Sequence, residues 1–405
     1  MIQDIRKYKV LLMLLIVFFS CNSFVLAVRF KSVSTAIMVA VIILVVLVSI
    51  TKGHNHIPRN ACMLVLVCGL NILITSLVNG YMNGYMLLFL EFVLSLACIR
   101  LYTKKEFVES YIFVIRFLAI YAIGIGIINL LVPGILSIFK TYYSSTNEIY
   151  YDAIFSFQSA GIQRINSIWG EPGMFSVFLI FAIVFECFFV DRPINYLTFS
   201  VLSLAEILTF SSAGYVCFAL IMVTTIVSSR KGSNERKVAY SVLVVCLALF
   251  FAINKFDWMQ TMVQASVNKL TGKENLSFIG RLAPMLYNIQ EGVKSLFWGN
   301  GMQGQSFYVD FSFYRGLLYC NTSTTTYLFN VFGIVISSIS VYLTVKSVWL
   351  AKHHGVVLRL LLFIVLILNV NAQDVSLDQF YWIFLFLSFM PGVETGDNTL
   401  YVEDY

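Results

Sequence analysis

Residues 164–190 read RINSIWGEPGMFSVFLIFAIVFECFFV, and the second part of this stretch decides the fold. Across residues 174–190 the side chains are almost continuously apolar, without the alternation expected of a strand that faces water on one side. In a membrane such a run satisfies its backbone polar groups by forming a helix. The polar residues just before it, which include Arg164 and Glu171, are then expected at the membrane's edge.

The rest of the chain has the same character. Its 405 residues are 59% hydrophobic and only 12% charged, and its mean hydropathy is +0.84. This composition provides too little polar surface for a soluble globule and predicts an integral membrane protein. Because the apolar runs are continuous, the expected fold class is all-α, a polytopic membrane protein whose whole length, 1–405, is a single transmembrane domain.

The apolar runs predict about twelve transmembrane helices. We interpret the first as an uncleaved span, because Arg29 and Lys31 follow it and no small-residue cleavage site is evident. The runs on either side of residues 211–212 are either two spans or one broken segment. The predicted helices occupy residues 8–28, 33–50, 61–78, 84–101, 112–132, 174–190, 194–210, 213–228, 238–253, 322–345, 357–371 and 377–391.

Basic residues are distributed unevenly between the loops. With the N-terminus inside, the inner loops collect most of the lysines and arginines, whereas the short outer loops hold only Arg29 and Lys31. This pattern predicts that both termini are cytoplasmic and that two long loops, about 133–173 and 254–321, face outward. The net charge of +6 largely reflects this topology, and nucleic acid is not expected as a partner.

The cysteines and histidines do not indicate a metal site. The eight cysteines lie almost all within predicted spans and are interpreted as small apolar packing residues. The four histidines, His54, His56, His353 and His354, fall in inner loops. An outward-facing site therefore lacks an imidazole as ligand or base, and we predict neither a metal nor a cofactor.

Three arginines, Arg164, Arg281 and Arg315, fall in the outward-facing loops. A guanidinium binds phosphate oxygens through paired donors, and a charged hydrogen bond is worth about 1.5–3 kcal/mol. Arginines that converge on a departing diphosphate would stabilise its developing charge. The alternative is that they are loop residues in contact with lipid headgroups.

Carboxylates accompany these arginines. Glu171 precedes Pro172, which suits the first position of a helix, so its carboxylate is expected at the helix's positive end. It can take a proton from a sugar hydroxyl or stabilise positive charge at an anomeric carbon. The alternative is a helix cap paired with Arg164. Asp374 and Asp378, beside the final span, are either helix-end residues or part of the same site.

Four charged residues lie within the apolar runs: Glu91, Arg116, Glu186 and Glu206. Each such charge costs about 2.5–3.5 kcal/mol in a membrane and requires compensation. Glu91 and Arg116 are candidates for an ion pair. Structural pairing or snorkelling is favoured over a proton or ion pathway.

The second outer loop contains an amphipathic segment after Arg281. It predicts a helix on the membrane surface, which either supports a lipid-linked substrate or packs across the bundle. The following GNGMQG at 299–304 matches GxGxxG but comes after a helix, so a helix-terminating turn is favoured over a diphosphate-binding loop. The apolar residues at helical spacing are Leu286, Ile289, Val293 and Leu296.

Several stretches together resemble the O-antigen polymerase (Wzy) family and, more distantly, the O-antigen ligases (WaaL-like). In such polymerases two outward loops carry essential arginines, some in an Arg-x10-Gly pattern, which Arg281 and Gly292 match and Arg164 does not. Ligase-type members often have a histidine near the end of the large loop, where this chain has Cys320 and Asn321. The similar stretches are 164–175, LTFSSAG at 208–214, 281–304, and NTSTTTYL at 321–328 followed by Gly333 and Ile334.

The resemblance implies a membrane-embedded glycosyltransferase with a GT-C-like fold, in the bacterial inner membrane with its site facing the periplasm. Its substrates would be undecaprenyl-diphosphate-linked oligosaccharide repeat units within the membrane lipid, and a chain-length regulator protein is a candidate partner. The expected catalytic residues are Glu171, Arg164 and Arg281. The expected substrate-binding residues are Arg315, Asn321, Asp374 and Asp378.

Two alternatives stay open. An O-antigen ligase would transfer finished glycan to a lipid core. A repeat-unit transporter, or flippase, should show related halves and charges in a central cavity, and the sequence has no convincing internal repeat.

Overall fold

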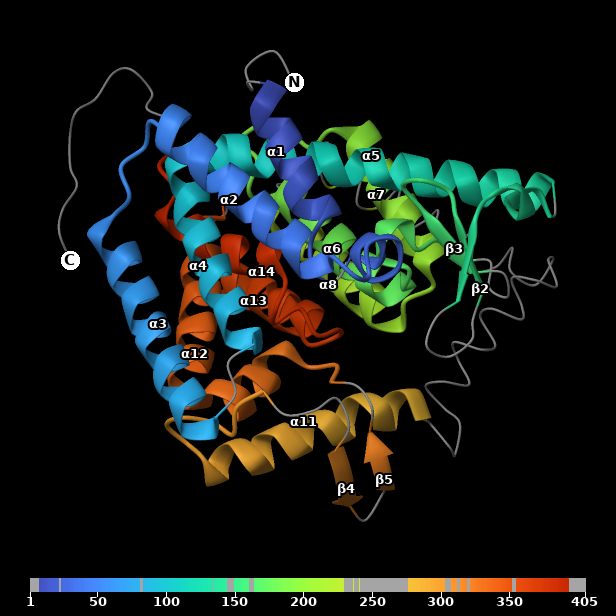
Figure 1. The fold of residues 1–405 in the computed structure, drawn as a ribbon. Helices are drawn as coiled ribbons and strands as arrows, with labels where there is room; N and C mark the ends of the chain where they lie inside the picture. Colours follow the sequence, from blue (N-terminus) through green and yellow to red (C-terminus); the bar gives the residue numbers. More distant parts are fainter. Residues whose placement is uncertain are drawn as a thin grey trace.

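The computed structural model describes residues 7–21, 23–80, 83–132, 134–143, 149–159, 164–228, 276–302, 307–311, 314–318, 321–351 and 355–392, together with residues 236 and 240. These residues are mostly helical (Figure 1). The α-helices are α1 (Lys7–Phe18), α2 (Ser34–Lys52), α3 (Arg59–Asn79), α4 (Asn83–Leu101), α5 (Lys104–Leu131), α6 (Pro172–Phe188), α7 (Tyr196–Thr209), α8 (Ser212–Ser228), α11 (Leu276–Lys294), α12 (Thr324–Val348), α13 (Val356–Val370) and α14 (Gln379–Leu385).

By length and composition, four of the described helices can cross a membrane: α2, α3, α5 and α12. The shorter helices α6, α7, α8 and α13, and α14 with the 3-10 turn Phe386–Phe389 that continues it, are also apolar. The protein is therefore predominantly helical and membrane-embedded. The predicted helix at 238–253 lies, apart from residue 240, outside the described residues.

The helix α6, formed by the quoted run, is the centre of the bundle. All of its residues from 174 to 188 are buried. It packs against α5, α7, α8 and α13. A helix that is apolar on every side is stable only when it is surrounded, and here protein surrounds it. The break between α7 and α8 falls at Phe210, whose φ of 51° is left-handed, so the predicted runs on either side of residues 211–212 form two helices rather than one.

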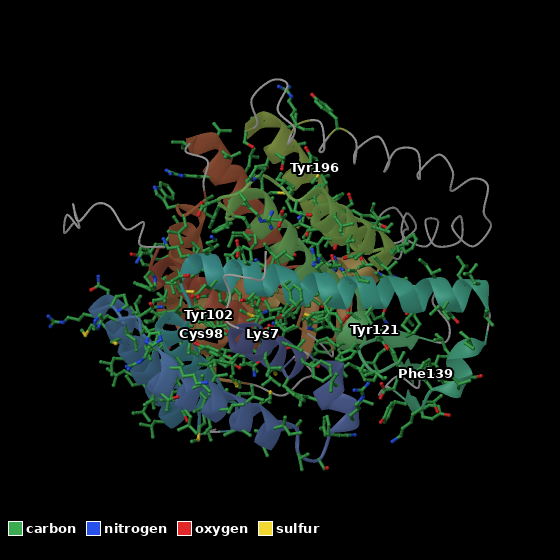
Figure 2. The ribbon with its side chains drawn as sticks, turned by 90° about the horizontal axis from the view of Figure 1, so that it is seen from above. Lys7, Cys98, Tyr102, Tyr121, Phe139 and Tyr196 are labelled. Atoms are coloured by element: carbon green, nitrogen blue, oxygen red, sulfur yellow. The ribbon has the colours of Figure 1, made fainter. Side chains whose placement is uncertain are left out.

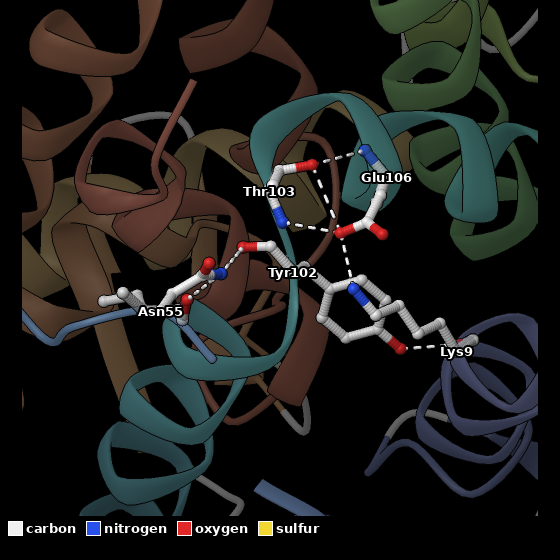
Figure 3. A network of polar contacts seen from close by, with 6 residues as sticks. Lys9, Asn55, Tyr102, Thr103 and Glu106 are labelled. Atoms are coloured by element: carbon white, nitrogen blue, oxygen red, sulfur yellow. Dashed lines mark hydrogen bonds and ion pairs between the residues drawn. The ribbon is translucent and has the colours of Figure 1, made fainter. Parts of the chain in front are cut away.

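A polar network holds the start of α5, which runs across the molecule from near Tyr102 past Tyr121 (Figure 2). Thr103 and Glu106 form a capping box, and Glu106 also pairs with Lys9 of α1 at 2.6 Å. Tyr102 Oη donates to the Lys9 carbonyl at 2.6 Å, and Asn55 Nδ2 donates to the Tyr102 carbonyl at 2.9 Å (Figure 3). This box starts α5 at Lys104, before the predicted residue 112.

Two small antiparallel sheets in the long loops depart from the all-helical expectation. Their sequences, such as IYYD and FYVDF, are rich in the aromatic and β-branched residues that favour strands. In the second loop, Val309 and Phe311 of the hairpin pack on Ala283 and Tyr287 of α11. The strands are β1 (Thr141–Tyr143), β2 (Ile149–Asp152) and β3 (Phe157–Ser159) in one sheet, and β4 (Phe307–Phe311) and β5 (Tyr314–Leu318) in the other.

The predicted amphipathic helix is α11, which lies across one end of the bundle and packs on α12 (Figure 1). Its apolar residues Ile289 and Val293 are 38% and 62% exposed, whereas Asn288 is buried. The helix therefore turns Asn288 toward the protein and leaves an apolar stripe uncovered by the described residues.

The glycine-containing turn after α11 packs against α12 at a break in that helix. Gly333 interrupts α12 with φ 71° and ψ −162°. The amides of Asn300 and Gly301 donate to main-chain carbonyls of α12 at 2.7 and 3.1 Å. These amides are thus occupied, as a structural turn requires. Gly304, the last glycine of the motif, lies outside the described residues.

Candidate active site

Polar residues from several helix ends meet at the end of the bundle that α11 crosses. Arg164 and Glu171 come from the segment before α6, and Arg281 comes from α11. Asn321 precedes α12, and Asp374 lies between α13 and α14. The chain thus brings residues that are far apart in the sequence to one place.

Arg164 is fixed by the end of α7. Its Nε donates to the Thr209 carbonyl at 2.6 Å, and an Nη donates to the Phe210 carbonyl at 2.8 Å. Gln158 of β3 donates to the Arg164 carbonyl at 2.7 Å. The last carbonyls of a helix lack intrahelical donors and carry partial negative charge, so they suit a guanidinium. The other N–H groups of Arg164 make no hydrogen bond to another residue that the structure describes.

Glu171 occupies the N-cap position of α6, with Pro172 following it as predicted. Its side chain is exposed, makes no capping hydrogen bond and forms no ion pair with Arg164. Instead, Gln373 Nε2 donates to Glu171 Oε1 at 2.8 Å. The alternative that Glu171 caps the helix while paired with Arg164 is therefore wrong, and the carboxylate is accessible.

Arg281 is partly buried and has no hydrogen bond or ion pair with another residue that the structure describes. Burial lowers the pKa of Arg281, and the charge of Glu171 opposes this effect. The pKa of Arg164 is likewise lowered by burial, and Tyr215 and Glu171 raise it while Arg281 lowers it further. Each arginine therefore interacts electrostatically with Glu171, and the arginines also interact with one another. The structure brings all three predicted catalytic residues together.

Asn321 and Asp374 belong to a hydrogen-bonded chain beside these three residues. Asn288 Nδ2 of α11 donates to Asn321 Oδ1 at 2.9 Å, and Asn321 Nδ2 donates to Asp374 Oδ2 at 3.4 Å. Burial raises the pKa of Asp374, although hydrogen bonds from Ser376 and Asn321 oppose the shift. Both residues thus connect α11 to the loop that carries Gln373.

The other two predicted substrate-binding residues lie in different elements. Asp378 is buried and caps α14, its Oδ1 accepting from the Phe380 amide at 3.0 Å. Asp378 is thus a helix-end residue, and its substrate-binding role stays a prediction. Arg315 lies in β5, opposite Asp310 of β4, and its role stays a prediction.

Three of the four charged residues within the spans have a polar partner. Glu186 forms a two-pronged ion pair with Arg192 at 2.7 and 2.8 Å, which confirms structural pairing there. Glu206 accepts from Ser176 Oγ at 2.7 Å. The predicted Glu91–Arg116 pair is wrong, because an Nη of Arg116 donates to Thr198 at 3.0 Å. The Glu91 carboxylate has no hydrogen-bond partner among the described residues.

Sequence reasoning missed Gln373 and the importance of Asn288. Gln373 lies in the short polar connection between two predicted spans, which was the available signal. Comparisons with family models, curated proteins and solved structures give no significant match to this chain.

Proposed function

We propose that the protein is a polysaccharide polymerase of the O-antigen type. It joins undecaprenyl-diphosphate-linked repeat units at the periplasmic face of the bacterial inner membrane, through a GT-C-like fold of about twelve spans. The observation that carries the proposal is an exposed carboxylate, Glu171, that lies within electrostatic range of two guanidiniums from different loops, Arg164 and Arg281.

In the proposed reaction, a hydroxyl of the incoming repeat unit attacks the anomeric carbon of the growing chain. The new glycosidic C–O bond forms as the bond to the lipid diphosphate breaks, and the diphosphate leaves with that electron pair. Arg164 and Arg281 stabilise its charge, and Glu171 accepts the proton of the attacking hydroxyl. The reaction uses neither a metal nor a nucleotide sugar.

The geometry suits these roles for a physical reason. Arg164 is already anchored through two of its donors, so it is pre-organised to bind an anion with the others. Arg281 keeps its donors uncommitted within the described part of the chain. A diphosphate bound between them would stay close to Glu171, which interacts with both.

The test is the length distribution of surface glycan in a strain that lacks the gene. We expect single-repeat glycan in the deletion strain and a ladder when the unmodified gene is returned. Arg281→Ala should not restore the ladder, whereas the control Lys294→Ala, at an exposed position on the same helix, should restore it. Full-length polymer trapped on the lipid carrier would indicate a ligase, and repeat units trapped on the cytoplasmic face would indicate a transporter.

A further inference from the structure

The connection between α13 and α14 has a fixed main chain around Gln373. Thr324 Oγ1 donates to the Gln373 carbonyl at 3.1 Å and accepts from the Val375 amide at 2.9 Å. Asp374 Oδ1 accepts from the Ser376 amide at 3.0 Å. Because these bonds restrain the chain on both sides of Gln373, its side chain leaves the loop from a defined position.

That side chain reaches across 202 positions of the sequence to Glu171, where Nε2 lies 2.8 Å from Oε1. The start of α6 leaves space for it at Gly173. A Cβ at this glycine would lie 2.4 Å from Gln373 Nε2 and 3.4 Å from Glu171 Oε1. Any larger residue at this position would push the amide away from the carboxylate. The hydrogen bond therefore depends on both the loop and the glycine.

An amide N–H that donates to a carboxylate oxygen restricts the rotation of the acid. A general base must be correctly placed before it can take a proton. We infer that Gln373 is the positioning residue of Glu171, holding its carboxylate in one orientation beside Arg164 and Arg281. This inference rests on the proposed function, in which Glu171 is the base.

A purely structural role for Gln373 predicts a different outcome. If the amide only tied the loop to α6, its loss would reduce the amount of folded protein and leave the kcat of the folded fraction unchanged. A positioning role instead lowers the kcat of the folded protein and leaves KM nearly unchanged. The two roles are therefore separated by kinetics.

The experiment uses the purified full chain in proteoliposomes with a synthetic undecaprenyl-diphosphate-linked repeat unit. Initial rates of polymer formation, normalised to the amount of folded protein, are measured across substrate concentration for the wild type, Gln373→Met and Gln373→Asn. Met has a similar length but no donor, and Asn keeps the amide but is one methylene too short to reach. We expect both to lower kcat on the order of ten-fold with KM within about two-fold.

Gly173→Ala provides an independent route to the same result, because it displaces the amide without changing Gln373. We expect the same loss of kcat with little change in KM. The matched control is Gly124→Ala in α5, where a Cβ would meet no atom within 4 Å among the described residues. Its kcat and KM should match those of the wild type.

A wild-type kcat in the folded fraction of Gln373→Met and Gln373→Asn overturns the inference and leaves the proposed function intact. A rise in KM without a fall in kcat in these variants also overturns it. If the wild-type protein forms no polymer at any pH, the proposed function itself fails.

Discussion

Asn288 of α11 donates a hydrogen bond to Asn321, ahead of α12, at 2.9 Å. The same Asn288 accepts one from Asn330 Nδ2 at 3.0 Å, so one buried amide ties the surface helix to α12. Asn321 Nδ2 in turn donates a hydrogen bond to Asp374 Oδ2. The helix that carries Arg281 is in this way linked to the loop whose Gln373 bonds Glu171.

Replacing Asn288 by Ala should destabilise the protein. The partners left behind, Asn321 and Asn330, would lose hydrogen bonds in a buried place, at a cost of about 1–3 kcal/mol. Thermal unfolding of the purified protein in detergent should show a lower Tm. The control Gln290→Ala, exposed on the same helix, should leave Tm unchanged. Equal Tm values for the two variants would argue against a stabilising role for the hydrogen bonds of Asn288.

Arg164→Lys should abolish most of the activity although it keeps the charge. A lysine cannot bond both the Thr209 and Phe210 carbonyls and still present a planar pair of donors to a phosphate. We expect polymer formation to fall roughly ten- to hundred-fold, the equivalent of one charged hydrogen bond. Arg59→Lys, an exposed arginine at the start of α3, is the control and should be fully active. Full activity of Arg164→Lys would contradict the proposal that Arg164 binds a phosphate through a pair of guanidinium donors.

Much of the helical pattern was predictable because apolar runs and polar connections alternate clearly. The errors have identifiable causes. The predicted first span ran to residue 28, whereas α1 ends at Phe18, and the Cys21 amide bonds the Gln379 side chain at 2.8 Å. That partner is far away in the sequence, so no local pattern indicates it. The early start of α5 did have a local signal, the capping box of Thr103 and Glu106.

The candidate site was predictable only in part. The sequence points to Arg164, Glu171 and Arg281. Few charged residues lie in the outward loops near long apolar runs, so these three stand out. The buried capping role of Asp378 and the bond between Gln373 and Glu171 depend on how α6, α13 and α14 pack. Helical periodicity does not contain that information.

Arg192→Ala should destabilise the protein more than Arg192→Lys. The Glu186 carboxylate is fully buried, and removing its partner leaves an uncompensated charge. Because Arg192 itself is 26% exposed, we expect a loss of roughly 2–4 kcal/mol, toward the lower end for buried pairs. Chemical denaturation of the two variants measures the difference. If both lose the same stability, the two-pronged geometry contributes little.

The raised pKa of Asp374 predicts a pH-dependent contribution to stability. Its folded-state pKa lies above the ordinary value of 3.8, so the folded protein binds the proton more tightly than the unfolded chain does. This contribution is fully present below 3.8 and is lost as pH rises through the folded-state pKa. In Asp374→Asn that loss should disappear, so the variant gains stability relative to the wild type as pH rises. Unfolding temperatures of the wild type and Asp374→Asn, measured as pH rises, test this prediction. A constant difference between the two proteins at every pH would contradict it.

The most direct test of the central claim is reconstitution of the purified protein in liposomes with an undecaprenyl-diphosphate-linked repeat unit as the only substrate. Products longer than one repeat and released lipid diphosphate are measured together. We predict that the wild type releases one lipid diphosphate for each new glycosidic bond, without added metal or nucleotide sugar, and that Arg281→Ala forms neither product. Polymer formation by Arg281→Ala at the wild-type rate, or repeat units carried across the bilayer without any new bond, would contradict it.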